Sequence, residues 1–188
     1  TPLAMTRGGG LLPNAGNNSF NSNGWATNVD GDSTVLNTGG FVEIGFTVED
    51  GFVATLDELL LGSRSSTSGP SEVGIFTSVD NFTSPIGTIQ EEGEFSNTRL
   101  DLSSIGDVTG EFAIRFFNVG GVSPAAPTAG EFDMDEDSTW RIVTLFENGF
   151  VDNTPGITGS VTAVPEPGTV GVLTIGGVVA LIRRRRRV

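Results

Sequence analysis

The sequence of 188 residues contains no cysteine, histidine, lysine or tyrosine. Without cysteine there are no disulfides. Without histidine and cysteine there is no Cys-His or Ser-His catalytic pair, and no zinc or haem site built from those ligands. Carboxylates remain available as calcium ligands and as acid–base pairs. The composition therefore excludes most common catalytic and metal chemistry, but it leaves calcium binding and glycoside hydrolysis open.

Charge is distributed unevenly along the chain. The sequence has 10 arginines and 23 acidic residues, which gives a formal net charge of −13. Five of the arginines form one block at 183–187, so the remainder carries 5 − 23 = −18. A nucleic-acid-binding surface needs Lys and Arg distributed over it to contact phosphates, and an acidic chain with half of its arginines in one block lacks such a surface. We therefore expect no nucleic-acid partner.

Short segments with period-two alternation follow one another from Trp25 onward. In 41–48, apolar residues alternate with Glu43, Gly45 and Thr47, which is typical of a half-buried strand, and Asp50-Gly51 then favours a turn. Comparable patterns predict further strands at 52–61, 72–78, 86–90, 97–102, 111–118, 138–146 and 158–164.

Strands at intervals of about ten residues with Gly-rich turns are typical of an antiparallel β-sandwich or jelly roll. We therefore expect an all-β domain at 25–163. Residues 1–24 are rich in Gly, Asn and Ser and are expected to form a loose N-terminal segment with a short strand near Phe20, and 62–70 is expected to be a loop around Arg64.

The larger side chains of this domain have expected places. Trp25 and Trp140 lie in strand patterns and are expected in the core. Four arginines are expected on the sheet surface in ion pairs, since the domain is so acidic. They are Arg64, Arg99, Arg115 and Arg141.

The C-terminus has three parts in a fixed order. Pro165-Glu166-Pro167 precedes an uncharged segment, 168–182, and the chain then ends in Arg183, Arg184, Arg185, Arg186, Arg187 and Val188. As a helix, the uncharged residues from Pro167 to Ile182 would span about 24 Å, and arginine side chains that extend toward the lipid headgroups would cover part of the deficit from roughly 30 Å. The pattern predicts a single transmembrane helix at 168–182. Its arginine flank would face the cytoplasm and the acidic domain would lie outside.

This order resembles the PEP-CTERM sorting signal of bacterial exported proteins, here covering 164–188. The resemblance implies that an exosortase, a membrane-embedded processing enzyme, acts near Pro165-Glu166-Pro167. It implies an inner-membrane-anchored precursor that is then delivered to the cell surface or the extracellular matrix, and a link to exopolysaccharide and biofilm. The two prolines would hold Glu166 in an extended conformation outside the following helix.

A second resemblance concerns the domain itself. Leu56-Asp57-Glu58-Leu59, Arg64-Ser65, Ser68-Gly69-Pro70 and Ser78-Val79-Asp80-Asn81-Phe82 resemble the β-sandwich ectodomains that precede such tails. Asn81 stands where those domains usually have Gly, and Asn tolerates a positive φ. The resemblance implies a fold rather than an activity.

Two acidic segments are candidate calcium sites. In 28–33, Asp30 and Asp32 offer alternating oxygen ligands, although the segment lacks the rest of an EF-hand loop and an Asp-Gly turn is the preferred interpretation. Asp133, Asp135, Glu136 and Asp137 form the second cluster, for which a solvated loop is the default interpretation and calcium binding the alternative.

No motif marks a catalytic residue, so we expect a non-enzymatic domain with calcium as the one candidate cofactor. Two alternatives stay open. A carbohydrate-binding module would need an exposed aromatic platform, for which Trp25 and Trp140 are the candidates. A secreted hydrolase would need two carboxylates facing each other across a cleft, about 5–10 Å apart.

Overall fold

The computed structural model describes residues 1–16, 19–25, 37–120, 138–147, 150–153 and 155–165. Apart from two short 3-10 turns, η1 (Ser78–Asp80) and η2 (Ser103–Ile105), their regular structure is β-strand. The strands are β1 (Thr6–Arg7), β2 (Leu12–Pro13), β3 (Phe20–Asn23), β4 (Phe41–Thr47), β5 (Phe52–Ser65), β6 (Glu72–Thr77), β7 (Pro85–Gln90), β8 (Ser96–Asp101), β9 (Asp107–Val108), β10 (Glu111–Asn118), β11 (Thr139–Val143), β12 (Leu145–Glu147), β13 (Phe150–Asn153) and β14 (Gly156–Ala163).

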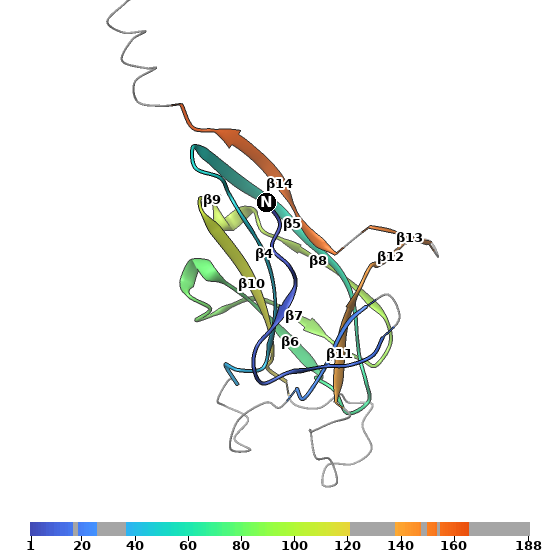
Figure 1. Cartoon of the computed structure of the whole chain (residues 1–188). Helices are drawn as coiled ribbons and strands as arrows, with labels where there is room; N and C mark the ends of the chain where they lie inside the picture. The colour runs from blue at the N-terminus through green and yellow to red at the C-terminus, as the bar shows by residue number, and fades with distance from the viewer. Residues whose placement is uncertain (17–18, 26–36, 121–137, 148–149, 154, 166–188) are drawn as a thin grey trace, which may run out of the picture.

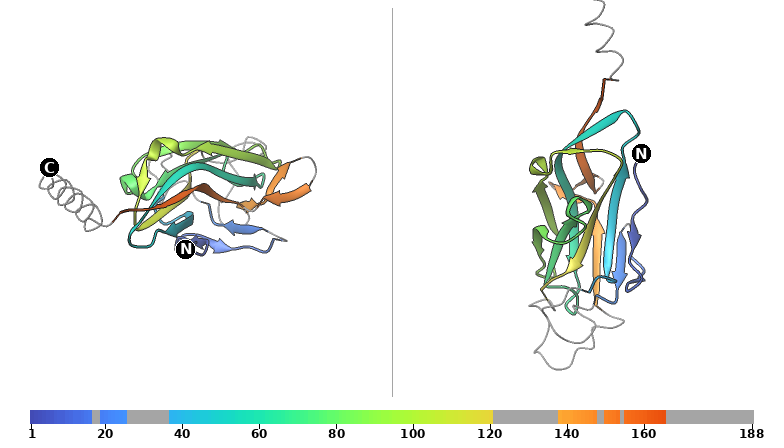
Figure 2. Two further views of the ribbon diagram at one scale, coloured as in Figure 1. Left: turned by 90° about the horizontal axis from the view of Figure 1, so that it is seen from above. Right: turned by 90° about the vertical axis from the view of Figure 1, so that its left-hand side faces the viewer.

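These strands pair antiparallel into two main sheets (Figures 1 and 2). Sheet A has the order β1-β4-β10-β6-β7, and sheet B has the order β14-β5-β11-β3-β2, with β8 and β9 along the other side of β5. Strands β12 and β13 form a separate pair. The prediction of an antiparallel all-β fold is confirmed, and the two sheets lie in a sandwich-like arrangement around a shared core.

The core is built from the alternating positions that the sequence pattern indicates. Phe112, Ile114 and Phe116 of β10 are buried, as expected for one face of a strand, and Val42 lies beside them on β4. Both tryptophans are fully buried, which confirms the expectation for Trp25 and Trp140. The residues that sheet B contributes to the hydrophobic core are Ala54, Leu56, Leu59, Leu61, Val108, Trp140 and Ile142.

Strand β5 is longer than its pattern predicts, and the expected loop around Arg64 is therefore wrong. Its second half pairs with β11, so that Arg64 lies opposite Arg141 and Gly62 opposite Val143. Small residues make this close pairing feasible, since a Cβ at Gly62 would lie 2.5 Å from the carbonyl oxygen of Thr144. The Gly- and Ser-rich residues 62–65, whose composition suggests a loop, therefore form the largely buried end of β5.

Residues 1–24 also differ from the expected loose segment. Strand β3 confirms the strand expected near Phe20 and pairs with β11, while β1 pairs with β4. The terminal ammonium group of Thr1 donates to the carbonyl oxygen of Thr47 at 2.7 Å, and Leu11 is buried in the core. The Gly- and Asn-rich N-terminus therefore supplies edge strands to both sheets.

Within the described residues, no helix is long and apolar enough to cross a membrane. The predicted transmembrane segment at 168–182 and its flank at 183–187 lie outside those residues, as do Glu166 and Pro167.

The turn that joins β6 to β7 has the backbone conformation that the resemblance suggests. Asn81 has φ +58° and follows η1 as its C-cap, and Phe82 has φ +57°. A positive φ is uncommon for a bulky residue such as Phe. The Phe82 N–H donates to the Thr77 carbonyl at 2.9 Å, and the guanidinium carbon of Arg115 lies 3.9 Å from the Phe82 ring centroid. These two interactions hold Phe82 in its unusual conformation.

Because Asn adopts this conformation more easily than a β-branched residue, Asn81→Val should lower the free energy of unfolding by about 1–2 kcal/mol. Asn81→Gly is the matched control and should stay within about 0.5 kcal/mol of the wild type. Urea unfolding of the three proteins measures this, and equal midpoints for the Val and Gly variants would contradict the assignment.

Candidate functional site

One recess in the described structure is an apolar groove between the two sheets. Its volume is about 450 Å³. One wall is formed by the N-terminal residues and β4 of sheet A, and the other by β5 and β14 of sheet B. The lining residues are Thr1, Pro2, Leu3, Met5, Ile44, Gly45, Phe46, Ala54, Thr55, Leu56 and residues 155–161.

The groove exists because the sandwich is closed along one side and open along the other. On the closed side, the edge strand β7 lies against β8, since a Cβ at Gly87 would meet the Leu100 side chain at 3.0 Å. On the open side, β14 and the N-terminal residues are separated by the groove. A smaller recess of about 250 Å³ shares Thr1, Phe46 and Val161 with it and extends toward Phe52.

The chemistry of this groove is that of a contact surface. Its lining includes no Asp, Glu or Arg side chain, and the N-terminal ammonium group of Thr1 is hydrogen-bonded to Thr47. The smaller recess adds one carboxylate, Glu49. The two facing carboxylates that a hydrolase would need are therefore not found in the lining of either recess.

A second feature is a buried carboxylate that the sequence reasoning missed. Glu91 is 1% exposed and follows β7, where the chain crosses from sheet A to sheet B. Its Oε1 accepts hydrogen bonds from Ser63 Oγ and Trp140 Nε1, both at 2.6 Å, and its Oε2 accepts from the Ser65 N–H at 3.2 Å. Among the described residues it is the one ionisable side chain that is fully buried.

Burial raises the pKa of Glu91, and the hydrogen bonds from Ser63, Trp140 and the Ser65 N–H oppose part of that rise. Burying a carboxylate is costly unless it is well hydrogen-bonded. Here three donors from β5 and β11 meet a side chain from the end of β7. We infer a positioning role, in which Glu91 fixes the crossing between the sheets.

The raised pKa predicts a pH dependence of stability. Between the ordinary pKa of 4.5 and the raised native value, the native state binds more protons than the unfolded state. The contribution of Glu91 to stability is therefore fully present below its unfolded pKa and falls as the pH rises through this window, by up to about 1.4 kcal/mol per pH unit. Urea unfolding should show that Glu91→Gln gains stability relative to the wild type as the pH rises.

Glu92→Gln, the same substitution at the exposed neighbour, controls for the change in net charge. If the difference in unfolding free energy between the wild type and Glu91→Gln is the same at all pH values, titration of the Glu91 carboxyl group does not cause the pH dependence of stability.

Among the side chains that the structure describes, the two tryptophans do not form the platform that a sugar-stacking surface needs. The rings of Trp25 and Trp140 contact each other edge-on, with centroids 5.3 Å apart, inside the core. On the outer face of sheet A, the Arg115 guanidinium lies 4.2 Å from the centroid of Phe41 and 3.9 Å from that of Phe82. Phe95 is more open at 42% exposure.

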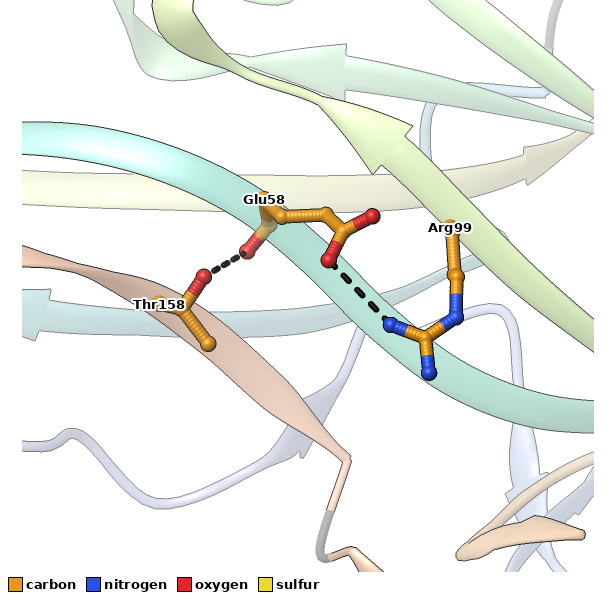
Figure 3. A network of polar contacts seen from close by, with 3 residues as sticks. All are labelled: Glu58, Arg99 and Thr158. Atoms are coloured by element: carbon orange, nitrogen blue, oxygen red, sulfur yellow. Dashed lines mark hydrogen bonds and ion pairs between the residues drawn. The ribbon is translucent and has the colours of Figure 1, made fainter. Parts of the chain in front are cut away.

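The surface arginines follow the expectation in part. Arg115 pairs with Glu43 at 2.7 Å, and Arg99 pairs with Glu58 at 3.3 Å (Figure 3). The second pair is largely exposed, so it contributes about 1 kcal/mol at most. Arg64 instead donates to the Gly93 carbonyl at 2.7 Å.

Arg64 and Arg141 were expected in ion pairs, but both lie near the ring of Phe95 instead. The guanidinium groups of Arg64 and Arg141 lie 5.1 and 5.9 Å from the centroid of the Phe95 ring. The two arginines lie on adjacent strands, β5 and β11, and cation–π contacts place both of their positive charges near this one aromatic side chain.

The candidate calcium ligands Asp30, Asp32, Asp133, Asp135, Glu136 and Asp137 lie outside the described residues. Within the described ranges, no group of three or more acidic residues has the geometry to hold a metal ion. The residues that flank the two acidic segments are nevertheless joined. Trp25, which precedes 26–36, donates its N–H to Ser138 Oγ at 3.3 Å, and Asn118 Nδ2 donates to the Trp25 carbonyl at 2.8 Å. The topology therefore brings the bases of both segments to one end of the fold.

If either acidic segment binds calcium, the ion stabilises the folded state by mass action. Removing calcium with EGTA should then lower the melting temperature, and added calcium should restore it. Asp30→Asn with Asp32→Asn tests the first segment and Asp133→Asn with Asp135→Asn the second. Identical melting curves with and without EGTA would exclude a stabilising calcium site.

Comparison of the chain with protein-family models, with curated proteins and with solved structures found no match. The function is therefore inferred from the sequence and the structure of the chain itself.

Proposed function

We propose that this chain is an exported cell-surface or extracellular-matrix protein whose non-enzymatic β-domain is sorted and processed through its C-terminal signal at 164–188. The observation that carries the proposal is the order Pro165-Glu166-Pro167, uncharged segment and arginine block. In this proposal an exosortase acts near the Pro-Glu-Pro motif, and the membrane segment at 168–182 is a transient anchor with its arginines in the cytoplasm.

The end of the fold is compatible with this role. One residue beyond β14, the N–H of Val164 donates to the Gly51 carbonyl at 2.8 Å. Pro165 has no N–H to continue the ladder and is exposed. The motif therefore begins where the sheet stops, next to the turn between β4 and β5, so an enzyme can reach it without unfolding β14.

The features of the domain support a structural rather than a catalytic role. Its large groove is apolar and lacks carboxylates, and both tryptophans are committed to the core. The carbohydrate-binding alternative loses its two candidate stacking residues, and among the described side chains Phe52 and Phe95 are the aromatics that remain exposed. We accordingly propose that delivery to the cell surface or matrix brings the protein to the exopolysaccharide, and we assign no polysaccharide-binding site to the domain.

Replacing Pro165, Glu166 and Pro167 with alanine should abolish processing while the precursor still inserts in the membrane. In the native host, intact-mass measurement of the membrane and released fractions should show an uncut chain in the membrane and none released. Pro85→Ala, at an exposed proline far from the signal in sequence, is the control and should be processed normally. Normal release of the triple variant would overturn the proposal.

A further inference from the structure

We propose that β14 is the interface for a second copy of this chain, with the two β14 strands pairing antiparallel across a two-fold axis. Sheet B would then continue from one copy into the other. This inference uses the described domain and is independent of the sorting signal.

The first observation is that β14 is a long edge strand. Among the described strands it pairs with β5 alone, its ladder has one register shift between Thr158 and Gly159, and residues 158–163 are exposed. Natural edge strands are usually shortened, charged or interrupted by proline, because an open edge recruits other chains. The other edges here have such features, since β2 is two residues long and contains Pro13, β7 begins at Pro85, and β8 contains Arg99. Strand β14 has eight residues, no proline and no charge.

The second observation is electrostatic and favours a copy of this chain as the partner. Two copies of so acidic a chain repel each other wherever their carboxylates meet, whereas β14 is an uncharged strip of Ser, Thr, Val, Ile, Ala and Gly. A strip without charge can face itself across a two-fold axis at no Coulombic cost, as an isologous contact requires.

The antiparallel arrangement follows from the ends of the strand. The Val164 contact with Gly51 places the turn containing Glu49 and Asp50 beside the C-terminal end of β14. An eight-residue strand is about 26 Å long. Antiparallel pairing would put the two turns at opposite ends of the strand pair, beyond the Debye length of about 8 Å. A parallel pair would place their carboxylates together.

The third observation is the apolar surface that such pairing would cover. Val161 is 64% exposed at the junction of the two recesses, and Phe52 is 40% exposed, with its neighbour Val53 opposite Thr162 of β14. Val161 of the second copy would extend the apolar contact along the groove.

The test is the molar mass of the full chain in a nonionic detergent, measured by sedimentation with the detergent contribution subtracted. We expect a mass twice that of the monomer, unchanged by added salt. Thr162→Lys should restore the monomer, because a charge on the strand disrupts edge pairing even though it lowers the net negative charge. Thr88→Lys, the same exposed change on the edge strand β7, should remain dimeric.

Because the chain has no cysteine, a cysteine scan along β14 locates the axis. Single Thr158→Cys, Ser160→Cys and Thr162→Cys variants should form disulfide-linked dimers with a maximum at one position, and Thr88→Cys should not. A monomeric full chain would overturn the proposal. So would a dimer that tolerates Thr162→Lys and shows no preferred cysteine, since the membrane segment or another surface would then hold it together.

Discussion

The fold depends on the environment of Trp140. Its ring contacts Trp25, which follows β3, edge-on and Phe116 of sheet A at a centroid distance of 5.5 Å, and its indole N–H donates to Glu91. A buried indole N–H without an acceptor would cost about 1–3 kcal/mol, so the large aromatic core at this end requires a buried acceptor. The chain provides it from the segment that crosses between the sheets. One carboxylate therefore links the packing of both sheets to the path of the backbone.

The two sides of the sandwich differ in how closely the sheets approach each other. Glu91 holds the crossing from β7 to β8, and Leu100 then packs over Gly87 and closes that side. On the opposite side the chain also changes sheets, between β4 and β5, yet β14 and the N-terminal residues leave the apolar groove between them. The same side carries the exposed Val161 and the uncharged edge of β14.

Much of this fold could be predicted from local patterns, because strand alternation and turn chemistry act over a few residues. The alternation in 41–48 and 111–118 identified core faces correctly, and Asn81 adopts the positive φ expected of it. The second half of β5 could not be predicted, since Gly62 and Ser63 resemble a loop until β11 pairs with them. Glu91 and the groove were missed for a related reason. Glu91 lies in an acidic segment, and only the three-dimensional fold places it beneath Trp140.

Strand β14 links the β-domain to the proposed C-terminal sorting signal. The N–H of Val164 makes a backbone hydrogen bond just beyond β14, which β5 holds along eight paired positions, and Pro165 follows it. An uncharged strand beside an acidic surface is also where self-repulsion is weakest. In the two proposals, charge therefore separates the roles of the chain: the C-terminal arginines would set the membrane orientation, the carboxylates would keep most of the surface apart from other copies, and the neutral edge of β14 would be available for pairing.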